Sequence, residues 1–223
     1  MLELIHSDVC GPMSIQARGG YEYFITFTDD YSRFGYVYLM KRKSKAFEKF
    51  KEFRVEVENQ LGKSIKAIRS NRGGEYLLRD FKDYLTENGI ISQLTAPGTP
   101  QQNGVTERRN RTLLDMVRSM MSYSTLPISF WGYALTTAMY LLNLVPSKFV
   151  PKTLVELWNR RKPSMRHLHI WGCPAHVLKG KSDKLQFKTE VVFFVGYPKR
   201  TVGGLFYSHK DNKVFVRTNA KFI

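Results

Sequence analysis

The sequence has only two cysteines, few acids and no long uninterrupted apolar run. Cys10 and Cys173 lie far apart, without a second Cys or a paired His at metal-ligand spacing, which excludes a disulfide framework and a structural zinc site. The longest apolar region, Trp131 to Val145, is broken by glycine and polar residues, so it predicts a core helix and no membrane span. No basic-then-apolar leader opens the chain, so we expect an intracellular protein.

The shortage of acids leaves a strongly basic chain. Lys and Arg number 35 against 19 Asp and Glu, which gives a net charge of +16. A surface this basic indicates a polyanionic partner, most often nucleic acid and less often an anionic membrane or an acidic protein. Hydrophobic residues make up 43% of the 223 residues, which is enough for one large domain or a domain with a small appendage.

The first hundred residues show the periodicity of a mixed sheet. Aromatic or β-branched runs predict strands over 2–9, 21–28, 34–40, 65–70 and 90–95. A helical period predicts one helix from Ala46 to Leu61, ended by Gly62, and a second from Leu78 to Asn88. A strand meander followed by alternating helix and strand indicates a mixed sheet with helices on its faces.

The second half is helical and then β-rich. Apolar spacing predicts an amphipathic helix from Val105 to Met121, a buried helix over 127–145 and a short basic helix over 153–161. Short β-type runs between lysine- and glycine-containing turns follow. We therefore predict a core over residues 1–147, a linking helix within 148–164 and a small β-rich domain over 165–223.

Three polar residues are candidates for one site. Asp8 is expected to end the first strand and Asn71 the fourth, so both should lie at one rim of the sheet. Glu107 falls in the first turn of the helix after a Pro- and Gly-containing loop, where the helix dipole favours a carboxylate. It could hold a metal or meet a phosphate, or it could only complement the dipole and the arginines beside it.

Longer motifs carry a family resemblance. The segments are HSDVCGPM, YFITFTDDYSR, IKAIRSNRGGEY, QLTAPGTPQQNGVTERRNRTLLDMVRSMM, IWGCPAHV and FVGYPK. With them the chain resembles the integrase catalytic core of copia-type (Pseudoviridae-like) LTR retrotransposon polyproteins. The resemblance implies a ribonuclease-H-like α/β fold, with a mixed five-stranded sheet flanked by helices, and a small C-terminal β-rich domain. It also implies DNA strand transfer and 3′-end processing on element ends and target DNA, by a dimer or higher homo-oligomer, and a nuclear and cytoplasmic location.

In that family an Asp, Asp, Glu triad, with 35 residues between its last two members, holds two Mg²⁺ or Mn²⁺ ions. Asp8 and Glu107 match the first and third positions, whereas Asn71 stands at the second. An amide keeps an oxygen acceptor but lacks the negative charge, so we expect weak metal binding and severely impaired catalysis. Glu75 or Asp80 could supply the missing carboxylate to the metal site only if the chain moved. The competing hypothesis is a non-enzymatic nucleic-acid-binding relic or domesticated module that keeps the fold.

Amide and guanidinium side chains around Glu107 are candidates for DNA contact. Such groups bind a phosphate backbone without reading its sequence, and they comprise Gln101, Gln102, Asn103, Arg108, Arg109 and Arg111. The alternative is that some of these arginines pair with local acids such as Asp115. Asp29 and Asp30 lie between two predicted strands, and we interpret them as turn residues and not as metal ligands.

Overall fold

A five-stranded mixed sheet forms the centre of the first half of the chain. The computed structural model describes residues 1–95, 104–147, 150–179, 188–199 and 201–223. Its strands are β1 (Ile5–Cys10), β2 (Tyr23–Asp29), β3 (Gly35–Met40), β4 (Ala67–Ser70) and β5 (Ile91–Leu94). They lie in the order β3-β2-β1-β4-β5, with the first three antiparallel and β1, β4 and β5 parallel. The predicted mixed sheet is therefore confirmed.

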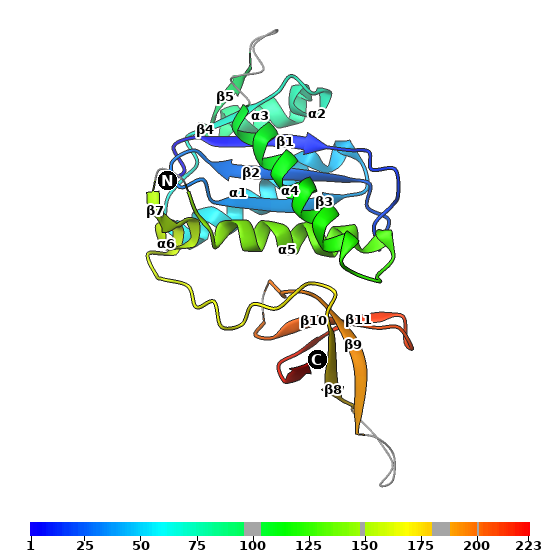
Figure 1. Cartoon of the computed structure of the whole chain (residues 1–223). Helices are drawn as coiled ribbons and strands as arrows, with labels where there is room; N and C mark the ends of the chain where they lie inside the picture. Colours follow the sequence, from blue (N-terminus) through cyan, green and yellow to red (C-terminus); the bar gives the residue numbers. More distant parts are fainter. Residues whose placement is uncertain (96–103, 148–149, 180–187, 200) are drawn as a thin grey trace.

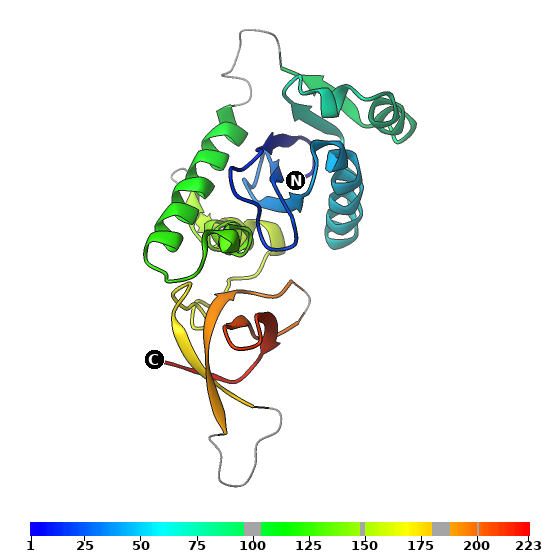
Figure 2. The same ribbon diagram turned by 90° about the vertical axis from the view of Figure 1, so that its right-hand side faces the viewer.

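Helices cover both faces of this sheet (Figures 1 and 2). On one face lie α1 (Ala46–Leu61), α2 (Gly74–Leu77) and α3 (Arg79–Glu87); on the other lie α4 (Gly104–Ser122) and α5 (Trp131–Asn143). Side chains of β2 alternate between the two faces, as the pleat of a strand requires. Phe27 packs in the cluster under α1, whereas Phe24 packs in the cluster under α4 and α5.

Most predicted elements are found within a few residues of their predicted ends. Helix α1 stops where Gly62 takes a left-handed conformation, φ 61°, which glycine adopts without steric cost. Three details differ: the four-residue α2 precedes α3, a 3-10 turn (Ile128–Phe130) precedes α5, and β1 continues past Asp8. The last difference arises because the ladder between β1 and β2 extends to Cys10 opposite Phe24. Over the described ranges, no helix is both long and apolar enough to cross a bilayer.

The linking segment is attached to the core. It contains a two-stranded ribbon, β6 (Pro146–Ser147) and β7 (Val150–Thr153), and the six-residue helix α6 (Leu154–Asn159). Thr153 and Glu156 form a reciprocal capping box at the start of α6. Trp158 stacks on Phe34 with ring centroids 4.9 Å apart. The helix is therefore shorter than the linking helix that the sequence predicts, and its aromatic side chain is part of the core.

The C-terminal part is a second five-stranded antiparallel sheet. Its strands are β8 (Pro174–Leu178), β9 (Thr189–Gly196), β10 (Gly204–Ser208), β11 (Lys213–Arg217) and β12 (Ala220–Phe222). They lie in the order β11-β10-β9-β8-β12. This confirms the β-rich character that the sequence predicts for the C-terminal residues.

The β-rich domain packs against the end of the core below α5 (Figure 1). The ring of Phe130 contacts that of Tyr207 at 4.6 Å between centroids, and the Arg18 guanidinium donates hydrogen bonds to Asn212 Oδ1 and O, both at 2.8 Å. Gly196 in β9 allows this close approach, because a Cβ there would lie 2.6 Å from Thr137 Oγ1 on α5. The two domains therefore share one buried apolar cluster.

Candidate active site

Asp8 lies inside β1 on the face covered by α4. It pairs with Thr26 of β2, so both side chains point to the same side of the sheet. Strands β1 and β4 pair only at Ile5 with Ile68 and at His6 with Arg69. Beyond these pairs Asn71, which directly follows β4, comes within hydrogen-bond distance of Asp8. The structure therefore brings together Asp8 and Asn71, as the sequence predicts.

Both oxygens of the Asp8 carboxylate accept hydrogen bonds from side-chain amides. Asn71 Nδ2 donates to Oδ1 and Asn110 Nδ2 donates to Oδ2, each at 2.9 Å. The amide oxygens have other partners: Asn71 Oδ1 accepts from the Gly73 amide, and Asn110 Oδ1 accepts from Thr26 Oγ1, again at 2.9 Å each. We refer to Asn71 and Asn110 as the amide clamp.

Sequence reasoning missed Asn110. It follows Glu107 by three residues, so both lie on neighbouring positions of one face of α4. This spacing from Glu107 was the one sequence feature that could have indicated Asn110 as a site residue. It is a weak indication, because a neutral amide in a helix can have many other roles. Asn110 is 5% exposed and belongs to the described residues with buried polar side chains.

Burial and nearby negative charges raise the pKa of Asp8. Burial raises the pKa of Asp8 to about 6, the hydrogen bond from Asn110 opposes this rise, and the negative charges of Glu107 and Glu75 add to it. The carboxylates of Glu107 and Glu75 are thus close enough to Asp8 to act on it electrostatically. Glu75 lies in α2 with its carboxylate folded over Gly73, where a Cβ would meet Oε1 at 2.5 Å.

The donor set does not fit a pair of magnesium ions. Magnesium takes oxygen ligands in near-octahedral geometry, but Asn71 turns its NH₂ group and not its oxygen toward Asp8. Within the described ranges, no group of three or more His, Cys, Asp or Glu side chains is placed to hold a metal ion. The oxygen of the Asn71 amide is therefore directed to the Gly73 amide and not toward Asp8.

Glu107 is exposed in the first turn of α4, and Arg108 and Arg111 are exposed on the same helix. Asp115 ion-pairs with Arg118 at 2.6 Å, and Arg118 is not one of the candidate arginines. Both Arg108 and Arg111 therefore remain candidates for DNA contact. Gln101, Gln102 and Asn103 lie outside the described residues.

Arg109 has a different environment from the exposed one that the sequence analysis expected. Its guanidinium points into the protein and donates to the Arg33 carbonyl at 2.6 Å and to Asn143 Oδ1 at 2.8 Å. Burial lowers the pKa of Arg109 to about 10, with a smaller effect of Arg33 in the same direction. The side chain joins α4 to the start of β3 and the end of α5, so it is not available to DNA.

The acids of the β2–β3 turn have structural partners, as the sequence predicts. Asp29 accepts hydrogen bonds from the Leu2 amide and from the amide and hydroxyl of Ser32, at 2.7 to 2.8 Å. Asp30 accepts from His6 Nε2 at 2.8 Å and Arg33 at 3.1 Å. These bonds close the turn.

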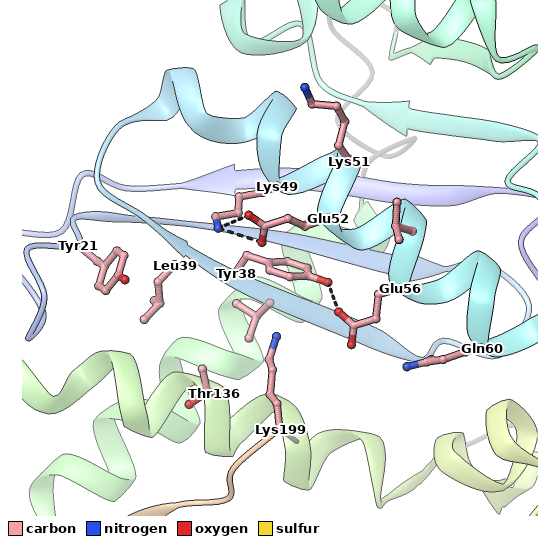
Figure 3. A pocket seen from close by; sticks show the side chains of 12 residues that line it. Tyr21, Tyr38, Leu39, Lys49, Lys51, Glu52, Glu56, Gln60, Thr136 and Lys199 are labelled. Carbon is pink, nitrogen blue, oxygen red and sulfur yellow. Dashed lines mark hydrogen bonds and ion pairs between the residues drawn. The ribbon is translucent and has the colours of Figure 1, made fainter. Parts of the chain in front are cut away.

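The most voluminous cavity described lies away from Asp8. It has a volume of about 960 Å³ and runs along β3 between α1 and α5. Figure 3 shows its mixed charges: Lys49 pairs with Glu52, Tyr38 donates to Glu56, and Lys199 reaches in from the β-rich domain. Among the residues that the structure describes, none of the candidate site lines it, so its size does not make it the active site.

The arrangement defines a class of protein. A mixed sheet in the order β3-β2-β1-β4-β5, with a central-strand carboxylate, a polar residue after β4 and a glutamate on a helix across the same face, is a ribonuclease-H-like core.

Comparisons with known families agree with this class. Residues 1–100 match the family described as integrase core domain, and residues 173–223 match the retroviral polymerase SH3-like domain. The retrovirus-related Pol polyprotein from transposon TNT 1-94 of Nicotiana tabacum is 43% identical over 217 residues, which cover 96% of this chain. The corresponding polyprotein from transposon RE2 of Arabidopsis thaliana is 30% identical over 88% of this chain.

Solved structures share the fold. A simian T-cell lymphotropic virus intasome in complex with PP2A regulatory subunit B56 gamma matches 99% of this chain with a TM-score of 0.58 and 17% identity, and 75% of that chain is covered. The HTLV-2 integrase catalytic core domain in complex with magnesium (trimeric form) matches 70% of this chain and 95% of that chain, with a TM-score of 0.52 and 19% identity. The chain belongs to the integrase core family of copia-type, retrovirus-related transposon Pol polyproteins. It spans 16% and 14% of the lengths of the two polyproteins.

Proposed function

We propose that this chain is the DNA-binding core of a retrotransposon integrase in which Asn71 impairs metal-dependent strand transfer and 3′-end processing. The observation that carries the proposal is the amide clamp, because both Asp8 oxygens that a metal would need accept N–H groups. The same observation supports a second function. If the clamp excludes metal completely, the chain is a nucleic-acid-binding module that keeps the integrase fold.

The proposed partners are element ends and target DNA, bound by a dimer or higher homo-oligomer in a nuclear and cytoplasmic protein. The net charge of +16 supports the nucleic-acid partner. Similarity to a protein solved as an intasome and to one solved as a trimer supports oligomeric action. The exposed Arg108 and Arg111 of α4 lie beside Glu107 and would contact the DNA backbone.

The metal hypothesis predicts a thermal shift that depends on residue 71. In Asn71→Asp a carboxylate oxygen would replace the Nδ2 atom that lies 2.9 Å from Asp8 Oδ1, and two carboxylates this close repel unless a cation binds. Saturating Mg²⁺ or Mn²⁺ should therefore raise the Tm of Asn71→Asp by roughly 5–10 °C. The unsubstituted chain should shift by less than about 1 °C.

Differential scanning fluorimetry with and without EDTA measures both shifts. Asn219→Asp is the matched control, because it adds the same charge at an exposed position of the β-rich domain. An equal metal-dependent shift in the unsubstituted chain would contradict the proposal.

The DNA-binding hypothesis predicts a change in salt dependence. Arg108→Ala and Arg111→Ala should each weaken duplex binding about equally for all sequences and reduce the slope of log K against log[salt] by about 1. Fluorescence anisotropy of a labelled duplex at several salt concentrations measures this slope. Arg79→Ala on α3 is the control, since it removes the same charge from a side chain that is 91% exposed. If Arg79→Ala reduced this slope as much as Arg108→Ala and Arg111→Ala do, DNA binding would not depend on α4.

A further inference from the structure

A second cavity lies between α5 and the β-rich domain, and none of the candidate site residues lines it. Its volume is about 440 Å³, within the range of small-ligand pockets. Aromatic rings form much of its wall, contributed by Tyr140 of α5, by His167 and His169 between α6 and β8, and by Tyr197 and Phe222 of the β-rich domain. Parts of the chain that are far apart in sequence are thus needed to build it.

The rings lie in contact with one another. Tyr140 and Tyr197 have centroids 4.5 Å apart, and His167 stands edge-on to Tyr197 at 5.7 Å. Tyr140 Oη and His167 Nε2 share a hydrogen bond of 2.6 Å, and His169 lies flat on Phe222 with centroids 3.5 Å apart. The wall is therefore fixed by contacts that do not involve a ligand.

The floor of the cavity is apolar and is formed by two buried rings. Phe194 and Phe206 are each 1% exposed and meet at 5.7 Å between centroids. Gly204 packs directly on them, because a Cβ there would lie 2.9 Å from Phe206 Cε2 and 3.0 Å from Phe194 Cε2. A ligand would therefore meet the half-buried and exposed rings of the wall, Tyr140, His167 and Tyr197, and not these two buried rings.

The charges around the cavity distinguish between two kinds of ligand. No Asp or Glu is among the described residues that line it, whereas the exposed Arg217 does line it. A cage for a methylated ammonium group would place a cation beside Arg217 with no acid to offset the repulsion. An uncharged aromatic ring that is joined to a phosphate suits both the rings and the arginine.

We propose that this pocket binds an unpaired nucleobase of single-stranded nucleic acid, stacked on the Tyr140–Tyr197 wall, with Arg217 close to the adjoining phosphate. Every base offers a π-face, so stacking of this kind tolerates sequence differences, and each base stack contributes substantially to single-strand affinity. The site is separate from Asp8 and does not depend on a metal.

The proposal is tested by adding the full chain to a single-stranded decanucleotide that contains one 2-aminopurine and measuring the fluorescence of that base. Binding should quench the fluorophore, and an otherwise identical oligonucleotide with abasic positions should bind about 5- to 100-fold more weakly. Tyr140→Leu and His167→Ala should each weaken binding of the normal oligonucleotide and reduce its advantage over the abasic one. Tyr123→Leu, at a ring that is 87% exposed outside this pocket, is the matched control and should change neither.

Ultraviolet crosslinking of a bromodeoxyuridine oligonucleotide to the unsubstituted chain gives a second measurement that needs no variant. The expected crosslinks fall on peptides that contain Tyr140, His167 or Tyr197. Equal affinity for normal and abasic oligonucleotides would overturn the proposal. So would binding of a trimethyl-lysine peptide that is lost in Tyr140→Leu while oligonucleotide binding is unchanged, since that result would assign the pocket to a cation.

Discussion

Asn71→Asp should raise magnesium-dependent strand transfer by about 10³-fold over the unsubstituted chain, because a metal ion that stabilises transition-state charge contributes several kcal/mol. The substitution restores a third carboxylate next to Asp8, and it removes the N–H group that Asp8 Oδ1 now accepts at 2.9 Å. Asn71 Oδ1 already accepts from the Gly73 amide, and a carboxylate oxygen can keep that bond. The backbone around residue 71 should therefore stay in place.

This gain is measured by assays of strand transfer and 3′-end processing on labelled element-end duplexes. Both proteins are compared at the same DNA occupancy. EDTA should abolish the activity of Asn71→Asp. The double variant Asn71→Asp with Glu107→Gln should return to the level of the unsubstituted chain, because it again leaves two carboxylates at the matching positions. An unsubstituted chain as active as Asn71→Asp would show that the amide clamp opens and that another ligand completes the site.

Phe130→Ala should lower the free energy of unfolding by about 3–5 kcal/mol, the usual loss for a buried phenylalanine. Phe130 is fully buried, its ring contacts Tyr207 of the β-rich domain, and the Arg18 guanidinium lies over it at 4.9 Å. The same substitution therefore removes core packing and one of the aromatic contacts between the two domains. Urea unfolding followed by tryptophan fluorescence measures the loss.

A matched control separates undocking from simple destabilisation. Phe53→Ala removes an equally buried ring from the opposite face of the sheet, away from the β-rich domain. Under native conditions Phe130→Ala should be cut faster by trypsin in the exposed segment around Arg166, whereas Phe53→Ala should be cut there no faster than the unsubstituted chain. Equal cleavage of both variants would show that docking does not depend on Phe130.

The local features of the fold were accessible from the sequence because they depend on neighbours along the chain. The period of apolar residues defined α1 and its end at Gly62, and the breakers before residue 104 marked the start of α4. Asn71 could be recognised as a departure from the family's second triad Asp, because long motifs on both sides of it resemble the family. The β-type runs after residue 165 were likewise visible as strands.

Other features required the tertiary structure, because they depend on residues distant in sequence. Nothing near Asn110 indicates that its amide donates to Asp8, 102 residues away. Arg109 and Arg108 are adjacent arginines, yet the turn of α4 places one beside Asn143 and leaves the other exposed. Their different roles arise from which face of the helix meets α5.

The sequence by itself determined the order of strands and helices along the chain and the basic charge, since these follow from periodicity and composition. The positions that match the triad came from the resemblance of its long motifs to the integrase family. Only the tertiary structure decided which atoms of Asn71 face Asp8, which arginines are free to meet DNA, and that the β-rich domain docks on the core through Phe130 and Tyr207. Hydrogen-bond direction and side-chain burial are set by three-dimensional packing, and a linear pattern of residue types does not contain them.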